Sequence, residues 1–385
     1  MKKIVMIARQ LSERIIPKFF KGKAIIILGP RQTGKTTLLK KLVNEDFSAY
    51  KSLWLDADDP SVRAELSNPN LADLKRIIAK NQIIVVDEAQ RISSIGLTLK
   101  MITDHFKSVQ LLVTGSSALD IAQGTTEPLT GRKYEYLLLP LAFEELQHHQ
   151  GFLEEKKALH NRLIFGSYPE IVTTEDSQLD VLKLLSGSYL YKDVFKYKDL
   201  RRPELLEALL QALAFQLGSE VSFQELSATI GADPETVRRY IELLEKTYVI
   251  FRLISLSRNL RNEIKKSRKI YFFDNGIRNA LINNFSPLNL REDRGALWEN
   301  FLMSERMKYL SNHNIYVNPY FWRTHQQQEI DYIEDLNGKL YAFEFKWNIK
   351  SKARIPLSFS KAYPNHSFQV ITPENYPDFL LPEST

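Results

Sequence analysis

The 385-residue sequence contains no cysteine. Disulfide bonds and thiolate metal ligands are therefore excluded, and the chain suits the reducing cytoplasm, where we expect it. The sequence also lacks any apolar run near the roughly 20 residues of a membrane-spanning helix. The apolar stretch after Met1-Lys2-Lys3 is interrupted at Arg9, which makes it too short for a secretory signal. We expect no membrane among the partners of this protein.

Neither sign of charge dominates, since 52 Lys and Arg residues face 46 Asp and Glu residues, for a net charge of +6. This excess permits contact with nucleic acid but does not require it. The content of 44% hydrophobic and 25% charged residues is ordinary for a globular protein. Because 385 residues exceed one ordinary core, we expect several domains, which we place at residues 1–150, 151–290 and 291–385.

A glycine-rich run, GPRQTGKTT, occupies residues 29–37 and follows a short apolar stretch. Gly29 and Gly34 let successive backbone N–H groups curl around phosphate oxygens without a Cβ in the way. Lys35 then reaches the β- and γ-phosphates, and Thr36 supplies a hydroxyl to Mg²⁺. The motif requires a strand before it and a helix after it, and the pattern on both sides fits. The residues expected to contact a nucleoside triphosphate are Gly29, Pro30, Arg31, Gln32, Thr33, Gly34, Lys35, Thr36 and Thr37.

Apolar runs alternate with helical stretches through the first 150 residues, which favours a parallel sheet with helices on its faces. The expected strands are residues 24–28, 52–55, 83–86, 110–114 and 134–138. The third of these strands ends in Asp87 and Glu88. Asp87 would hold Mg²⁺ through its water shell, and Glu88 would orient or deprotonate the attacking water. The alternative is that the two carboxylates begin a solvated helix.

Two further residues are candidates for a role near the γ-phosphate. Ser116 follows the fourth expected strand, where a polar side chain could sit beside the γ-phosphate; the alternative is a helix N-cap, which suits serine. Arg132 is a candidate to stabilise charge that develops on the γ-phosphoryl group, in its own subunit or in the neighbouring subunit of a homo-oligomer. The alternative for Arg132 is an ordinary surface position.

Together these motifs resemble a prokaryotic family of AAA-type ATPases. The resemblance lies in GPRQTGKTT at residues 29–37, VVDEAQ at 85–90, TGSS at 114–117 and LTGRKYEYLLLPLAFEEL at 129–146. It implies an AAA-type P-loop parallel sheet that uses ATP rather than GTP, with Mg²⁺ as its cofactor. Ala89 and Ala142 depart from the family pattern, where a larger aliphatic residue and a serine are expected, and neither change touches the chemistry.

Residues 151–290 are mainly helical by their pattern, with leucines at helical spacing between Leu205 and Leu217. A Gly-Ala turn at 231–232 and the helix start Asp233-Pro234 indicate helix-turn-helix punctuation. Two expected strands, near 249–255 and 269–273, would complete a winged helix. We therefore expect a helical lid and a winged-helix-like region here.

A basic stretch lies between those two strands and is opposed only by Glu263. Its members are Arg258, Arg261, Lys265, Lys266, Arg268 and Lys269. Such a stretch beside a winged helix could follow the phosphates of DNA, which makes DNA a candidate partner. The alternative is a solvated face on a lid.

Asn337-Gly338 is the strongest hairpin signal in the last region. With these residues as the turn, Asp331 lies directly opposite Glu344, and the apolar side chains of the ribbon, Ile330, Tyr332, Phe343 and Phe345, share the other face. Like charges that face each other across a strand pair are destabilising unless something bridges them, and a divalent cation is the natural bridge. Lys346 could then position a nucleophile or balance charge on a scissile phosphate.

This D…E-x-K arrangement resembles the PD-(D/E)xK nuclease superfamily, whose helical glutamate is matched by Glu299. The resemblance implies a C-terminal α/β restriction-endonuclease-like domain with a second Mg²⁺ or a Mn²⁺ at a nuclease site of Glu299, Asp331, Glu344 and Lys346. Residues 269–276, 298–300 and 320–332 also resemble the domain of unknown function that is commonly appended to these ATPases. The alternative is a salt-bridged hairpin without a metal.

Three functions are consistent with these motifs. In the first, ATP hydrolysis drives or gates a metal-dependent nuclease domain on DNA. In the second, the protein is an ATP-dependent switch whose C-terminal fold binds nucleic acid or protein without cutting it. In the third, it is a nucleotide-binding scaffold that does not hydrolyse, a reading in which Glu88 has no purpose.

Overall fold

The computed structural model describes residues 6–115, 129–174, 177–189, 202–257, 268–324, 326–351 and 353–381. By their contacts these residues divide into two compact units. Unit 1 contains Met1–Leu141 and Lys246–Tyr248, and unit 2 contains Ala142–Glu245 and Val249–Thr385.

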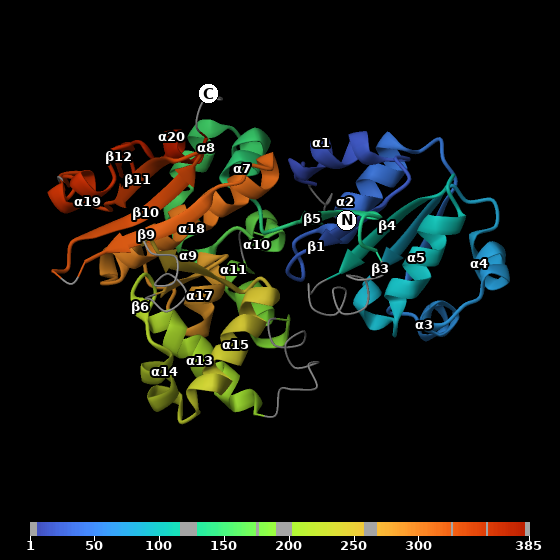
Figure 1. Ribbon diagram of the computed structural model, residues 1–385, viewed down its shortest axis with the longest axis horizontal. Coiled ribbons are helices and arrows are strands. Elements are labelled where there is room, and N and C mark those ends of the chain that lie inside the picture. The colour runs from blue at the N-terminus through green and yellow to red at the C-terminus, as the bar shows by residue number, and fades with distance from the viewer. Residues whose placement is uncertain are drawn as a thin grey trace. The chain divides into compact units, whose positions relative to one another are not determined.

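Unit 1 is built on a parallel sheet with the strand order β2-β3-β4-β1-β5 (Figure 1). Its strands are β1 Ala24–Leu28, β2 Ser52–Asp56, β3 Ile83–Asp87, β4 Gln110–Gly115 and β5 Lys133–Leu137. All five strands lie within one or two residues of the expected positions. The expectation of an α/β fold with a parallel sheet is therefore confirmed.

The three central strands of this sheet are buried along their whole length, which explains their unbroken apolar sequences. Alternate residues of β1 enter different cores: Ile26 packs with Ile95 and Leu99 of α5, whereas Ile27 packs with Leu38 of α2. Helices therefore cover both faces of the sheet. They are α1 Leu11–Ile15, α2 Lys35–Lys41, α3 Pro60–Ser67, α4 Leu71–Ile78 and α5 Ile95–His105.

Unit 2 combines many helices with a second sheet. Its described helices are α7 Phe143–Gln150, α8 Phe152–Lys157, α9 Leu159–Phe165, α10 Pro169–Thr173, α11 Gln178–Leu184, α13 Pro203–Phe215, α14 Phe223–Ile230, α15 Pro234–Lys246, α17 Asn275–Leu281, α18 Arg294–His313, α19 Leu357–Ala362 and α20 Tyr376–Leu380. The expected cap of α15 is present, since Asp233 Oδ1 accepts from Thr236 N at 2.8 Å.

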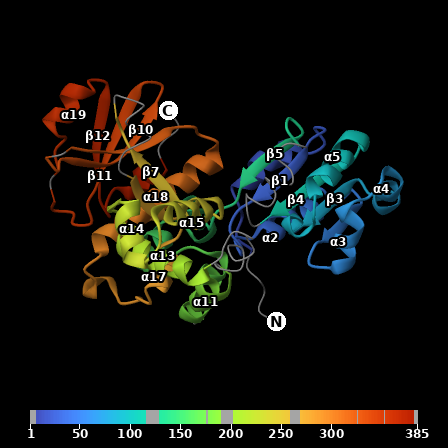
Figure 2. The same ribbon diagram turned by 60° about the horizontal axis from the view of Figure 1, so that its bottom comes forward.

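The sheet of unit 2 has the strand order β12-β11-β10-β9-β7-β8-β6, and Figure 2 shows its C-terminal strands beside α19. The strands are β6 Glu220–Val221, β7 Ile250–Ser255, β8 Arg268–Phe272, β9 Asn318–Arg323, β10 Glu329–Leu336, β11 Lys339–Phe345 and β12 His366–Ile371. The winged-helix strands were expected to complete a separate region. Instead, β7 also pairs with β9, and Leu256 N donates to Phe321 O at 2.7 Å. One sheet therefore runs through both regions that we had placed at 151–290 and 291–385.

The hairpin of β10 and β11 has the register expected from its Asn337-Gly338 turn, since Leu336 pairs with Lys339 and Tyr332 with Phe343. The prediction that four apolar side chains share one face of this hairpin is only partly right. Tyr332, Phe343 and Phe345 pack around Phe379 of α20, but Ile330 packs on the other face in a cluster with Phe359 of α19. The reason is a register shift between Ile330 and Ile333 in the pairing of β10 with β9, which turns Ile330 to the opposite face.

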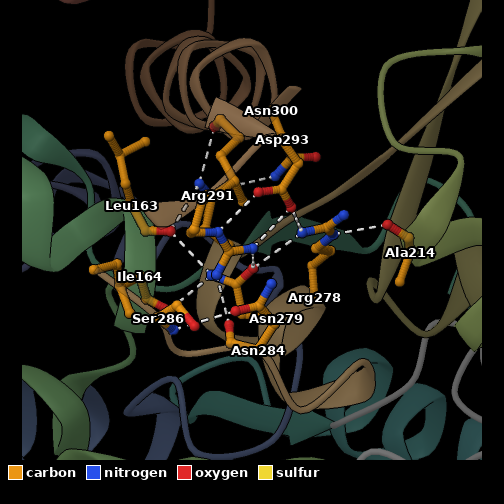
Figure 3. A network of polar contacts seen from close by, with 12 residues as sticks. Leu163, Ile164, Ala214, Arg278, Asn279, Asn284, Ser286, Arg291, Asp293 and Asn300 are labelled. Atoms are coloured by element: carbon orange, nitrogen blue, oxygen red, sulfur yellow. Dashed lines mark hydrogen bonds and ion pairs between the residues drawn. The ribbon is translucent and has the colours of Figure 1, made fainter. Parts of the chain in front are cut away.

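Buried polar side chains join the helices of unit 2 (Figure 3). Arg278 Nε donates to Ala214 O at 2.8 Å, and Asp293 accepts from both Arg278 and Arg291. Asn279 Nδ2 donates to the carbonyl of Ile164 at 2.9 Å. The segment that begins at Asp274 thus connects α9, α13 and the start of α18 by hydrogen bonds. Part of it, residues 274–276, was noted in the sequence only for its family resemblance, and the structure gives it a role in holding the helices together.

The turn at Gly166-Ser167 belongs to the same framework. Ser167 N donates to Asp274 Oδ2 at 2.8 Å, and a Cβ on Gly166 would lie 2.0 Å from Asp274 Oδ1. Burial raises the pKa of Asp274, and the nearby ammonium of Lys308 acts in the opposite direction. Residue 166 is therefore a glycine because the Asp274 carboxylate fills the space that a Cβ would need.

Arg306 of α18 and Glu334 of β10 form a buried ion pair beneath the C-terminal strands. Arg306 Nε and Nη2 lie 2.7 and 2.9 Å from the two carboxylate oxygens, and Arg306 Nη1 donates to Phe379 O at 2.9 Å. Tyr332 also donates to Glu334, at 2.9 Å. Every side of the pair is thus hydrogen-bonded, the condition under which a buried pair is tolerated. Among the helices of the described residues, none is long and apolar enough to span a bilayer.

Replacing Arg306 with methionine should lower the free energy of unfolding of unit 2 by about 3–5 kcal/mol, because it leaves Glu334 buried without its cation. The matched control is Arg238→Met on α15, whose ion pairs with Glu235 and Glu242 are exposed to solvent, so their loss should change the stability far less. Thermal denaturation followed by circular dichroism measures both. Equal destabilisation by the two substitutions would contradict this account.

Candidate active site

The loop that joins β1 to α2 carries the glycine-rich run. Gly29 has φ +146°, and a Cβ there would lie 2.1 Å from Leu138 O, so no larger residue fits. Gly34 has φ +91° and immediately precedes α2. Both glycines therefore occupy backbone conformations that other residues rarely adopt. The loop has the tight backbone path that the motif was expected to require.

Side chains inside the loop hold its shape. The Lys35 ammonium is buried and donates to Gly29 O at 3.0 Å and Pro30 O at 2.7 Å. Thr33 Oγ1 donates to Pro30 O at 2.9 Å. Gln32 has φ +59°, and its buried Oε1 has no hydrogen-bond partner among the described residues. The loop thus offers a cation and a run of backbone N–H groups in one place, a donor set that fits a polyphosphate.

Arg9 supports the backbone of the loop, and it was not predicted from the sequence as part of the site. Its Nη1 donates to Thr33 O at 2.6 Å and its Nη2 to Leu139 O at 2.7 Å, and the side chain is buried. In the sequence Arg9 only marked the end of an apolar stretch. Its partners are 24 and 130 residues away, so no local pattern could have identified it.

Thr36, Asp87 and Thr114 meet at the carboxyl edge of the sheet. Thr36 Oγ1 donates to Asp87 Oδ2 at 2.8 Å, and Thr114 Oγ1 donates to Asp87 Oδ1. The edge brings them together because β1, β3 and β4 are parallel neighbours, so the chain segments that follow β1 and β3 lie beside the end of β4. A hydroxyl and a carboxylate at hydrogen-bond distance are oxygen ligands of the kind that Mg²⁺ prefers.

Glu88 follows directly and is held on three sides. It adopts a left-handed backbone conformation with φ +53°, and its N–H donates to Thr114 Oγ1 at 3.0 Å. Its carboxylate accepts from Gln90 Nε2 at 2.7 Å and lies 4.0 Å from Arg31 Nη2. Thr114 thus contacts both acidic residues. It was missed because we looked for the γ-phosphate contact two residues later in the sequence, at Ser116, which lies outside the described residues.

Arg132 does not lie at this edge. Its backbone carbonyl accepts from Ala24 N, at the amino-terminal end of β1, whereas the phosphate loop follows the carboxyl-terminal end. Its guanidinium instead pairs with Asp104 of α5, with Nε 2.7 Å from Oδ1. This pair lowers the pKa of Asp104. The expectation that Arg132 acts on the γ-phosphate of its own subunit is therefore wrong, and action on a neighbouring subunit stays a prediction.

The four residues of the expected nuclease site come together in unit 2, in the company of a lysine. Lys269 Nζ, from β8, lies 3.0 Å from Glu299 Oε1 and 2.5 Å from Glu329 Oε1. Tyr271 donates to the same Glu299 oxygen at 2.6 Å. The other members are Asp331, whose Oδ2 accepts from Phe345 N at 2.7 Å, and Glu344, which pairs with Lys346 Nζ at 2.6 Å.

Burial and like charge govern the acidity of this cluster. Burial raises the pKa of Asp331 well above its ordinary value, and the negative charges of Glu299 and Glu344 raise it further, while Lys269 acts against them. The neighbouring carboxylates raise the pKa of Lys269 above its usual value although burial opposes the shift. The ammonium therefore stays charged at any physiological pH.

No group of three or more His, Asp or Glu side chains in the described residues has an arrangement that could hold a metal ion. Instead of converging on one point, the carboxylates of unit 2 each engage a proton donor of the protein. Lys269 had been assigned to a basic stretch that follows DNA; it is buried inside the cluster, and residues 258–267 of that stretch lie outside the described residues.

Three family profiles match successive parts of the chain. Residues 21–147 match the profile described as an AAA domain. Residues 156–288 match a domain of unknown function (DUF8612), and residues 294–378 match another (DUF4143).

Relatives over most of the chain are themselves described as uncharacterised. A protein of Mycobacterium tuberculosis is 26% identical over 345 residues, which is 88% of this chain and 73% of the relative. A protein of Methanocaldococcus jannaschii is 24% identical over 385 residues, 94% of this chain and 82% of the relative.

Among solved structures, a signal transduction ATPase with numerous domains and a tetratricopeptide repeat sensor, from Pyrococcus horikoshii, has 13% identity and a TM-score of 0.30; the match covers 81% of this chain and about half (48%) of that chain. Drosophila ORC bound to AT-rich DNA and Cdc6 has 10% identity and a TM-score of 0.26, covering 71% of this chain and 91% of that one. Such low TM-scores support no inference. With the match of residues 21–147 and the geometry of the loop, unit 1 is an AAA-type P-loop domain with a nucleotide-binding site.

Proposed function

We propose that this protein is a Mg²⁺-dependent ATPase. The observation that carries the proposal is the 2.8 Å hydrogen bond from Thr36 Oγ1 to Asp87 Oδ2, with Glu88 as the next residue. A hydroxyl and a carboxylate in this relation fit a hydrated Mg²⁺ ion, which supplies neutralising charge to the phosphate oxygens. A second carboxylate beside that pair serves hydrolysis rather than binding alone.

Each residue then has a defined task. The N–H groups of the loop and the Lys35 ammonium bind the phosphates, and Thr36 with Asp87 holds the metal. Glu88 orients the attacking water and accepts its proton. Thr114 fixes both acidic residues through one hydroxyl, so the distance between metal ligand and base is set by the protein. The preference for ATP over GTP rests on the AAA-type resemblance.

Replacing Glu88 with glutamine should lower ATP turnover by about 100-fold or more, since the group that accepts the proton is lost. ATP binding should persist, because the loop and Lys35 are unchanged. Turnover is measured by phosphate release and binding by calorimetry, with Glu65→Gln on the exposed face of α3 as control. Unchanged turnover in the Glu88 variant would favour the scaffold that binds nucleotide without hydrolysing it.

Replacing Thr114 with valine should lower kcat by about 10- to 100-fold, the effect of losing hydrogen bonds to charged groups worth about 1.5–3 kcal/mol. The KM for ATP should change little, since the hydroxyl of Thr114 bonds to Asp87 and to the backbone of Glu88 and not to the loop or Lys35. Thr114→Ser keeps the hydroxyl and should restore most of the rate. If serine and valine behave alike, the hydroxyl has no part in positioning Glu88.

We further propose that nucleic acid gates the ATPase and that unit 2 binds it without cutting. Against cleavage stands the engagement of Glu299 by Lys269 and Tyr271, which leaves the expected metal ligands paired with protein donors. In favour of binding stand the net charge of +6 and the basic residues of 258–268. The assignment of a second Mg²⁺ or a Mn²⁺ to this unit is the competing proposal.

Single-stranded or duplex DNA should stimulate ATP turnover at about 50 mM salt and lose its effect near 200 mM, because released counterions make such binding steeply salt-dependent. The same reactions, run with Mg²⁺ and with Mn²⁺ and analysed on gels, should show no nicked DNA. Nicking that disappears in Glu344→Ala would restore the nuclease reading. Turnover that ignores DNA at both salt concentrations would remove nucleic acid as the gating partner.

A further inference from the structure

Lys269 occupies an unusual position for a lysine. It lies on β8, between β7 and the edge strand β6 of the unit 2 sheet, and its side chain is only 2% exposed. A lysine is rarely so buried unless its charge is compensated. Here two carboxylates from different elements compensate it, Glu299 of α18 and Glu329 of β10. The ammonium therefore ties the helix to the hairpin.

Cations already lie among the carboxylates around Lys269. Glu299 and Glu329 both contact Lys269, and Glu344 contacts Lys346. Arg323 lies 3.8 Å from Glu329 and is shared with Glu220 at the same distance. A divalent ion added to this set would be repelled by the Lys269 ammonium at close range.

At least one oxygen atom of each carboxylate in the cluster is also engaged by a donor of the protein. Glu299 Oε1 receives both Lys269 and the Tyr271 hydroxyl, and Asp331 Oδ2 receives the backbone N–H of Phe345. A metal site needs several oxygens directed at one point, with no cation between them. This requirement is not met among the described residues. The residues present therefore do not fit the metal that the nuclease resemblance implies.

We infer that Lys269 is the permanent cation of this cluster, that it stands where a divalent metal would bind, and that its removal converts the cluster into a divalent-cation site. The lysine and the metal are mutually exclusive occupants, because both require the charge of Glu299 and the neighbouring Asp331. The inference is independent of the ATPase, whose residues lie in the other unit.

The experiment is a titration of the full-length protein with Mn²⁺, without nucleotide, in which electron paramagnetic resonance counts bound ions. The wild type and Asp331→Asn should bind the same number of ions. Lys269→Met should gain one ion per chain, and the double substitution Lys269→Met/Asp331→Asn should lose it. Mn²⁺ should also raise the melting temperature of Lys269→Met and not of the wild type, since an ion that binds only the folded state stabilises it.

Lys339→Met is the matched control, because Lys339 is a lysine at the start of β11 in the same sheet but is exposed and contacts the ring of Tyr341; it should gain no ion. Should Lys269→Met fail to fold, Lys269→Gln replaces it, and the comparison of the wild type with Asp331→Asn stands by itself. A wild-type ion that Asp331→Asn abolishes would overturn the inference. So would folded Lys269 variants that gain no ion.

Discussion

The hydroxyl of Thr114 donates to Asp87 and accepts from the backbone of Glu88, and these two bonds define the geometry on which the proposed chemistry depends. They exist because β4 lies between β1 and β3 in a parallel sheet, so that three chain segments leave the sheet at one edge. The glycine-rich loop, the acidic pair Asp87–Glu88 and Thr114 are far apart in sequence, and the order of the strands brings them into contact. Arg132 shows the same constraint in the opposite sense. Because it lies at the amino-terminal end of β1, the sheet keeps it away from the site at the carboxyl-terminal edge.

The strands of unit 1 could be predicted because buried parallel strands are continuous apolar runs with clear ends. The acidic residues could be predicted because they follow such a run directly. Arg9 and Thr114 could not: each acts through a partner contributed by a distant segment, and nothing in the local pattern distinguishes Arg9 from a surface arginine. Local sequence thus reports elements and motifs, whereas supporting contacts depend on how elements are arranged.

In unit 2 the Asn-Gly turn fixed the hairpin register correctly, because a two-residue turn dictates which residues pair. The prediction of faces failed at Ile330, since a bulge depends on the third strand, β9, which the turn does not describe. Lys269 was misread for a related reason. Its neighbours in sequence are basic, but its neighbours in space are acidic, and only the pairing of β8 within the sheet decides between a lysine that faces phosphates and one that neutralises carboxylates.

Strand β7 is bonded to β8 on one side and to β9 on the other, across a junction where the family profiles change. A chain that ended near residue 290 would keep β7 but lose β9, and the freed backbone N–H and C=O groups would be open to pairing with other chains. The fragment would therefore aggregate rather than fold as a module. For the same reason an unrelated domain can replace the last 90 or so residues during evolution only if it supplies a strand that pairs with β7 in place of β9. The two profiles describe two stretches of sequence, but the regions they match share one sheet, so we expect them to be inherited together.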